Sequence, residues 1–267
     1  GMTLRMEYLV GRIRRNLVGL LGFIQRDLRQ SGFQPVAFDL RIDDRPDADD
    51  PDAPRVDPVE LDDGAGHIVR IVGTVDRVDA MPLEKLGRTY LRVVDYKTGR
   101  KAFSLSDVWY GMGLQMLLYL FTLEKHGAER YGKEIVPAGV LYVPAHDILV
   151  RADKRLSDEE IVAEKARKLH RSGLILSETE VVEAMEHGEA LQFLPLYRGK
   201  LAAEALATAE QLGKLSRFLE ETLSNMAGEL RGGSIAADPW YENDRANTCR
   251  TCDYCCLLYT SDAADEL

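Results

Sequence analysis

The sequence predicts an α/β domain with a mixed sheet flanked by helices, followed by a helical annex and a cysteine-bearing tail. Two observations support this fold class. Within residues 1–150, a helix, three strands, a second helix and a fourth strand follow one another; beyond residue 150, helix signals dominate. With 267 residues, 45% of them hydrophobic, the chain can bury a sizeable core. We expect a core at 1–150, an annex at 151–248 and a tail from 249.

The first element is an amphipathic helix from Met6 to Gln30, ended by Gly32. Apolar residues recur along it at intervals of three and four, which predicts one buried face. They are Met6, Leu9, Val10, Ile13, Leu17, Leu20, Leu21, Ile24 and Leu28. The other face is basic and either contacts nucleic acid or a partner or is simply solvated; it carries Arg12, Arg14, Arg15, Arg26 and Arg29.

Most of the net charge of −10 lies in one acidic loop, residues 43–63. Ten acidic and two basic residues there give −8, so the rest of the chain is nearly neutral. Four prolines in the same stretch predict a solvated, partly disordered excursion between strands. A DNA mimic or a metal store is the alternative interpretation.

Strands are expected at 33–42, 67–78 and 89–97, with a loop from Met81 to Arg88. The last strand ends in Asp95-Tyr96-Lys97, and alternation places Asp95 and Lys97 on one face. If the last two strands pair as a hairpin, Asp76 joins them. Two carboxylates suit Mg²⁺, and a nearby lysine can orient an attacking water, which is chemistry for phosphodiester hydrolysis. A surface ion pair is the alternative reading of the triplet alone.

A helix follows from Asp107 to His126, capped by Ser106 and ended by Gly127. Gln115 and Tyr119 share one face of it. They either support the site and its substrate or satisfy each other in the interior. The next strand, 137–148, is apolar nearly throughout and is therefore expected to be buried on both faces.

Three capping boxes mark helices in the annex, at Ser157/Glu160, Ser177/Glu180 and Thr208/Gln211. The last helix runs to Leu230, and its buried side should consist of Leu212, Leu215, Leu219, Leu223, Met226 and Leu230. A phosphate loop of the G-x-x-x-x-G-K-S/T kind is absent, so we do not expect this chain to hydrolyse ATP. No apolar run reaches the ~20 residues of a membrane span, and no leader opens the chain, which predicts a cytoplasmic location without membrane contact.

Three motifs in order, G-x-x-D-R-x-D at 73–79, D-Y-K-T-G at 95–99 and Q-x-x-x-Y at 115–119, resemble the RecB-like branch of the PD-(D/E)xK nucleases. From Phe33 to Cys252 the chain is similar to the C-terminal nuclease domain of AddB, the B-subunit family of bacterial AddAB helicase-nucleases. The segments DYKTGRKAFSLSDVWYGMGLQMLLYL, PAGVLYVPAHD, GLILSETEVVEAM and NTCRTCDY carry this likeness. It implies a restriction-endonuclease-like core and a DNA exonuclease that resects double-strand breaks for recombinational repair.

The resemblance implies that Asp76 and Asp95 bind Mg²⁺, helped by the main-chain carbonyl of Tyr96. Lys97 then positions the nucleophile or stabilises the developing charge. The family also carries a histidine ligand before its core. No histidine precedes His67 here, which leaves open whether this chain is active alone.

Further roles follow from the same resemblance. Gln115 and Tyr119 would hold the DNA strand. Arg77 and Asp79 would support the site, with Asp79 able to exchange roles with Asp76. Asp39 is a weaker candidate, at a position where AddB-like sequences usually carry an acid.

All four cysteines lie in the tail, at 249, 252, 255 and 256, and such clustering indicates a metal site before a disulfide. Half a zinc site is the generic interpretation of C-x-x-C. The resemblance instead assigns Cys249 and Cys252 to a 4Fe–4S cluster. The motif at 249–255 is partial, because the family's next cysteine falls near Leu258 and the upstream one precedes this chain.

The resemblance implies DNA as substrate and an AddA-type helicase-nuclease subunit as heterodimer partner. Residues 256–267 look like the in-frame translation of a transposase-type sequencing adapter, so we expect this tail to be non-native. Two alternatives remain for the domain. One is another nuclease of the superfamily, such as a cluster-bearing CRISPR-associated exonuclease, and the other is a non-catalytic scaffold that binds DNA or a partner.

Overall fold

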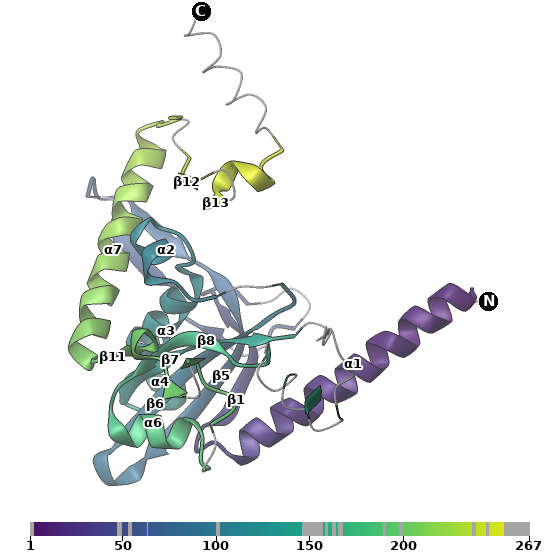
Figure 1. Cartoon of the computed structure of the whole chain (residues 1–267). Helices are drawn as coiled ribbons and strands as arrows, with labels where there is room; N and C mark the ends of the chain where they lie inside the picture. The colour runs from purple at the N-terminus through teal and green to yellow at the C-terminus, as the bar shows by residue number, and fades with distance from the viewer. Residues whose placement is uncertain are drawn as a thin grey trace, which may run out of the picture.

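The computed structural model describes residues 3–253 except 47–49, 53–54, 63, 100–101, 146–156, 158–159, 162–163, 165–167, 189–190, 198–199, 237–238 and 244–245. Its centre is a seven-stranded sheet in the order β11-β8-β7-β6-β5-β1-β2 (Figure 1). The strands are β1 (Gln34–Ile42), β2 (Arg55–Val56), β5 (Gly73–Leu83), β6 (Arg88–Lys97), β7 (Glu134–Pro144), β8 (Ser172–Leu176) and β11 (Leu206–Ala207). The pairs β1/β2, β6/β7 and β8/β11 are parallel and the pairs β1/β5, β5/β6 and β7/β8 antiparallel, which confirms the predicted mixed sheet.

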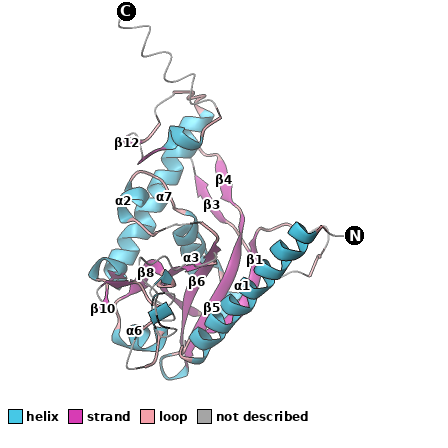
Figure 2. Ribbon diagram, turned by 45° about the vertical axis from the view of Figure 1, so that its right-hand side comes forward, coloured by secondary structure: helices cyan, strands magenta, loops and turns pink. Residues whose placement is uncertain are grey.

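Helices flank this sheet. They are α1 (Leu4–Arg29), α2 (Leu105–Trp109), α3 (Gln115–His126), α4 (Ala128–Tyr131), α6 (Thr179–Met185) and α7 (Ala209–Arg231). Figures 1 and 2 show α1 and α7 on opposite sides of the molecule. Two-stranded ladders complete the described part: β3 (Val59–Asp62) with β4 (Ile68–Ile71), β9 (Leu196–Tyr197) with β10 (Lys200–Leu201), and β12 (Tyr241–Asn243) with β13 (Ala246–Asn247).

The core lies between α3 and the central strands. Leu117, Leu120 and Leu123 of α3 are fully buried, as are Leu91 and Val93 of β6. Each such side chain contributes roughly 1.5–3 kcal/mol when it leaves water. This packing fixes α3, and with it Gln115 and Tyr119, against the strand that carries Asp95.

The predicted hairpin forms, but its boundaries differ from the expectation. The run from His67 to Val78 divides into β4 and β5 at Val72, and β5 continues to Leu83. The ladder keeps pairing through Leu83 with Arg88, so the expected loop shrinks to a 3-10 turn at Glu84–Leu86 and Gly87.

The helix expected over 107–126 is two helices. Ser104, not Ser106, caps α2, and its hydroxyl accepts the Asp107 N–H at 3.1 Å. Gly111 and Gly113 then adopt φ of 74° and 66°, which a glycine accepts without steric cost and which interrupts the helix before α3 begins. Apolar spacing continued across the break, so periodicity did not reveal it.

Helix faces are less buried than predicted. The apolar stripe of α1 is exposed in this chain at Leu4, Met6, Leu9, Val10, Ile13, Leu17 and Leu21. On α7, Leu212 and Leu219 are buried, whereas Met226 and Leu230 are exposed because they lie near the end of the helix. The capping boxes at Ser157 and Thr208 form, but Ser177 caps nothing, since α6 has Glu178 at its N-cap.

Among the described residues of the expected helical annex, β8 and β11 extend the main sheet. Within the described part of the acidic loop, β2 and β3 are ordered strands. Two parts of the expectation lie outside the described residues. They are positions 146–148 of the expected fourth strand and the tail with Cys255 and residues 256–267. Among the helices that the structure describes, none is both long and apolar enough to cross a membrane.

Candidate active site

The candidate site begins where β5 and β6 stop pairing. Their antiparallel ladder ends at Arg77 opposite Val94. One residue further on, the Asp76 side chain provides the next link, because its Oδ2 accepts the main-chain N–H of Tyr96 at 3.0 Å. This hydrogen bond holds the Asp76 carboxylate against the peptide that joins Asp95 to Tyr96.

Asp95 and Lys97 form an ion pair at the end of β6. Lys97 Nζ lies 2.9 Å from Oδ1 and 2.7 Å from Oδ2 of Asp95. Asp95 is buried, whereas the Lys97 side chain keeps 28% of its surface exposed. A substrate oxygen can therefore reach the ammonium group from solvent while the carboxylate is largely shielded from water.

Tyr142 of β7 also belongs to this site, and sequence reasoning missed it. The parallel register sets Tyr142 beside Asp95, and Lys97 Nζ lies 5.7 Å from the centre of its ring. Burial and the negative charge of Asp95 raise the pKa of Tyr142 to about 12. The phenol is therefore neutral at physiological pH and adds no anion to the site. The position of Tyr142 beside Asp95 follows from the register of β6 against β7. The apolar sequence of β7 does not indicate that register.

Gln115 and Tyr119 link two of the sequence motifs. Gln115 Nε2 donates a hydrogen bond to Tyr119 Oη at 2.9 Å. The Tyr119 ring packs against Gly73, where a Cβ atom would collide with the phenol oxygen. A larger residue at the start of G-x-x-D would therefore have to displace the tyrosine of Q-x-x-x-Y. The two side chains bond to each other rather than to Asp95 or Lys97.

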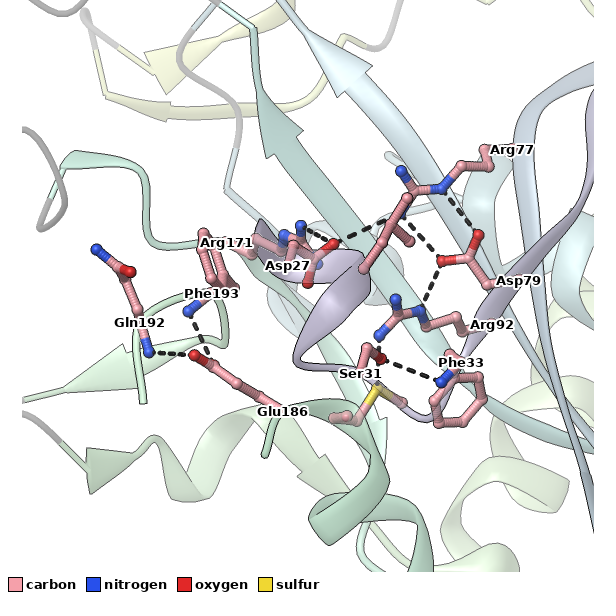
Figure 3. Close-up of polar contacts among 12 residues, drawn as sticks. Asp27, Ser31, Phe33, Arg77, Asp79, Arg92, Arg171, Glu186, Gln192 and Phe193 are labelled. Carbon is pink, nitrogen blue, oxygen red and sulfur yellow. Dashed lines mark hydrogen bonds and ion pairs between the residues drawn. The ribbon is translucent and has the colours of Figure 1, made fainter. Parts of the chain in front are cut away.

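Next to Asp76 in the sequence, Arg77 belongs to a buried charge cluster. The cluster is formed by Asp27, Arg77, Asp79, Arg92 and Arg171 (Figure 3). Asp79 accepts hydrogen bonds from Arg77 Nη2 at 3.0 Å and Arg92 Nε at 2.8 Å. Asp27 of α1 lies 2.6 Å from Arg171 and 3.9 Å from Arg77. Asp79 is thus fully buried between two guanidinium groups, which leaves Asp76 as the acid that lies beside Asp95.

Arg77 connects the buried charge cluster to the catalytic strand. Its Nη1 donates to Tyr96 Oη at 2.5 Å, and its guanidinium carbon lies 5.5 Å from the centre of the Tyr96 ring. Tyr96 stands between Asp95 and Lys97 in the sequence. The contact therefore holds the residue that separates the two charged groups of the site.

Asp39 of β1 reaches the same end of the sheet. The ladder pairs Phe38 with Arg77 and Leu40 with Val75, so Asp39 lies opposite Asp76. Its φ of 47° is in the left-handed region, which costs a non-glycine residue roughly 1–3 kcal/mol and is imposed by surrounding structure. The register thus brings a third, exposed acid to this part of β5.

Cys249 lies in a 3-10 turn, Thr248–Thr251, and Cys252 follows it; the Cys252 N–H donates to the Cys249 carbonyl at 3.1 Å. Cys249 is buried and Cys252 exposed. Over the residues that the structure describes, no three His, Cys, Asp or Glu side chains gather in a way that could hold a metal ion. A metal at the candidate site would therefore rest on two carboxylates and main-chain or solvent oxygens.

Known proteins are similar in sequence to almost the whole of this chain. A family model described as the PD-(D/E)XK nuclease superfamily matches residues 2–257. The chain is 33% identical over 263 residues to the B-subunit of the ATP-dependent helicase/deoxyribonuclease of Clostridium novyi, covering 96% of this chain and 22% of that protein. It is 31% identical over 260 residues to the protein of the same name from Ruminiclostridium cellulolyticum, covering 95% and 22%. The chain thus spans about a fifth of the length of the curated relatives it matches.

Proposed function

The chain belongs to the PD-(D/E)XK nuclease superfamily, and we propose that it hydrolyses the phosphodiester backbone of DNA with the help of a divalent metal ion. The observation that carries this proposal is the Asp95–Lys97 ion pair beside the Asp76 carboxylate. Two acids and an ammonium group at one strand end are a set that metal-assisted hydrolysis can use.

Asp76, Asp95 and the main-chain carbonyl of Tyr96 are the groups that would hold the metal ion. All of these donors are oxygens, which Mg²⁺ prefers, and Mg²⁺ often uses only one or two carboxylates and keeps several waters. Asp95 Oδ2 is buried and lies 2.7 Å from Lys97 Nζ, so a metal ion would take the place of the ammonium group at this oxygen. This donor set therefore fits Mg²⁺.

The bound ion would polarise the scissile phosphate and lower the pKa of a water molecule. Lys97 supplies the mobile charge: its ammonium group can turn from Asp95 toward the phosphate, where it orients the nucleophile or stabilises the developing negative charge. Arg77, through Tyr96, keeps Asp95 and Lys97 at the end of β6 in a fixed orientation. Gln115 lies on the exposed side of α3 and would contact the DNA strand.

At a finer level, we propose an exonuclease domain of a bacterial AddAB-type helicase-nuclease that resects double-strand breaks. The names of the similar proteins support this, because each is called the B-subunit of an ATP-dependent helicase/deoxyribonuclease. The partner would be an AddA-type subunit in the cytoplasm. Cys249 and Cys252 would contribute to a 4Fe–4S cluster with cysteines from the rest of the longer protein.

The test is degradation of end-labelled single-stranded DNA in the presence and absence of Mg²⁺, with Lys97→Ala as the variant. Lys85→Ala is the matched control, because Lys85 is an exposed lysine in the turn at the opposite end of the same hairpin. We expect Mg²⁺-dependent cleavage by the parent and by Lys85→Ala, and loss of cleavage in Lys97→Ala.

Equal cleavage by all three proteins would contradict the assignment of the site. If none of them cuts, the same pair of variants should be placed in the full-length protein together with its helicase partner. Retained cleavage by Lys97→Ala in that complex would support the non-catalytic scaffold for this domain.

A further inference from the structure

Exposed aromatic rings gather between α2 and α7. The Trp109 ring of α2 stacks on Phe218 of α7, with centroids 5.2 Å apart and an angle of 3° between the planes. The neighbouring Tyr110 contacts Trp240 at 6.0 Å. Trp109 nevertheless remains 69% exposed and Tyr110 57% exposed. We call Trp109, Tyr110 and Phe218 the aromatic shelf.

The shelf borders an open groove of about 370 Å³ between α2, α7, β8 and β11. The groove is lined mainly by apolar side chains, and Lys214 provides a positive charge at its wall. Lys214 pairs with Glu210 at 2.7 Å, one helical turn away on α7. Such exposed ion pairs are worth little, so an anionic ligand can recruit the ammonium group at low cost.

The sheet ties the shelf to the candidate active site. Asp95 pairs with Tyr142 on β7, and Tyr142 pairs with Ser172 on β8. Ser172 Oγ accepts the N–H of Phe103, two residues before α2, at 2.6 Å. Adjacent strands lie about 4.8 Å apart, so α2 is attached to the sheet roughly 10 Å from Asp95.

We propose that the aromatic shelf is a binding site for the unpaired bases of single-stranded DNA, with Trp109 as the stacking platform. This inference rests on the proposed function and names the form of DNA that the site receives. Bases of a duplex already stack on one another, whereas an unpaired base can lie on the open face of Trp109. Phe218 covers the other face and fixes the indole plane, so little rotational freedom is lost on binding.

Single-stranded DNA is favoured over an apolar protein segment by three features on one surface. Trp109 is stacked on one face by Phe218 yet is 69% exposed, Lys214 lines the adjoining groove, and the chain runs from the shelf through Gly111 and Gly113 into Gln115. A strand held on the shelf would therefore lie near Gln115, and the sheet contacts place α2 roughly 10 Å from Asp95.

The test measures binding in EDTA, where no metal-dependent cleavage can occur. A fluorescent oligothymidylate is titrated with the full chain, and an abasic deoxyribose-phosphate strand of the same length serves as the probe without bases. Trp109→Ala is expected to weaken binding of oligothymidylate by about 5- to 100-fold, the loss typical of one stacked base, and to leave binding of the abasic strand within about twofold. Trp109→Phe should restore most of the affinity, because it keeps a ring.

Tyr8→Ala is the matched control, because Tyr8 is a similarly exposed aromatic residue on α1. The chain has two tryptophans, so a Trp240→Phe background makes Trp109 the sole tryptophan reporter. Its fluorescence should be quenched by oligothymidylate and not by the abasic strand. Equal binding of oligothymidylate by the parent and Trp109→Ala would overturn the shelf.

These outcomes are separate from those of the proposed function. Weaker binding in Trp109→Ala supports the shelf even if Lys97→Ala leaves cleavage unchanged. If Lys97→Ala loses cleavage and Trp109→Ala binds oligothymidylate as the parent does, the proposed base-binding role of the aromatic shelf is wrong and the proposed nuclease function stands.

Discussion

The carboxylate of Asp76 accepts the main-chain N–H of Tyr96, at 3.0 Å, at the point where β5 and β6 stop pairing. A side chain thus continues the contact between two strands after their backbones have ceased to bond. The same contact places one acid beside the peptide that precedes Tyr96 and follows Asp95. The Asp76 carboxylate therefore has two roles: its oxygen accepts a hydrogen bond that joins the strands, and its negative charge would help to hold the metal ion. A substitution that keeps the oxygen and removes the charge tests the second role alone.

Asp76→Asn tests the charge of Asp76 separately from its hydrogen bond. The asparagine oxygen can still accept the Tyr96 N–H, so the fold should be retained, but the negative charge for the metal is lost. We expect cleavage to fall by about 100-fold or more, since even partners outside the metal shell typically cost 10–100-fold. The measurement is the rate of single-stranded DNA degradation together with the melting temperature. Parent-like cleavage would remove Asp76 from the metal site.

Tyr96→Phe tests the link between the buried charge cluster and the catalytic strand. The substitution removes the hydroxyl that accepts the 2.5 Å hydrogen bond from Arg77. A hydrogen bond to a charged group contributes about 1.5–3 kcal/mol, and we expect a loss of that order in the free energy of unfolding. Urea denaturation measures it, with Tyr8→Phe on the exposed face of α1 as control. Equal losses of unfolding free energy in Tyr96→Phe and Tyr8→Phe would show that the hydrogen bond from Arg77 to Tyr96 does not stabilise the fold.

Asp27→Ala should be strongly destabilising, because it leaves Arg171 and Arg77 without one of their buried anions. Breaking a buried pair by removing one partner costs about 3–5 kcal/mol. Glu7→Ala, an exposed acid in the same helix, should stay within about 0.5 kcal/mol of the parent. Urea unfolding of both variants decides the matter, and similar midpoints would show that the cluster does not need Asp27.

Tyr142 should make stability fall at alkaline pH. Its pKa is raised from 10.0 to about 12 by burial and by Asp95, so the folded chain disfavours the phenolate. The stability from this group is present below pH 10 and is lost as the pH rises through about 12. Tyr142→Phe should therefore lose less stability between pH 10 and 12 than the parent does. Urea unfolding across this range tests it, and parallel pH profiles would count against the raised pKa.

Thr208→Ala should lower the free energy of unfolding by about 1 kcal/mol, because the Thr208 hydroxyl and Gln211 form a complete capping box at the start of α7. Ser177→Ala tests the same motif where the box does not form, and we expect a change within about 0.5 kcal/mol. Thermal or urea unfolding compares the two. A cost for Ser177→Ala as large as that for Thr208→Ala would contradict the capping geometry.

The mixed sheet and the hairpin of the site could be predicted because their determinants are local. Asp76 and Asp95 stand on strands joined by a short turn, so alternation along each strand and the position of the turn specify their approach. The ion pair of Asp95 with Lys97 follows from the same alternation within one strand.

Long-range determinants could not be predicted in this way. Tyr142 enters the site because β7, which follows β6 only after several helices, pairs with β6 in parallel. Asp27 meets Arg171 although most of the sheet lies between them in the sequence. Neither partnership leaves a pattern in either segment alone. The division of the helix at Gly111 and Gly113 was missed because apolar spacing does not reveal backbone conformation, which here overrides periodicity.

The exposed apolar stripe of α1 has a consequence for how the chain behaves in solution. A net charge of −10 favours solubility through mutual repulsion, but salt screens that repulsion. Sulfate salts at the same time strengthen contacts between apolar surfaces. Molecules would then adhere along their first helices, and the purified chain should precipitate from ammonium sulfate at a lower concentration than its charge alone suggests.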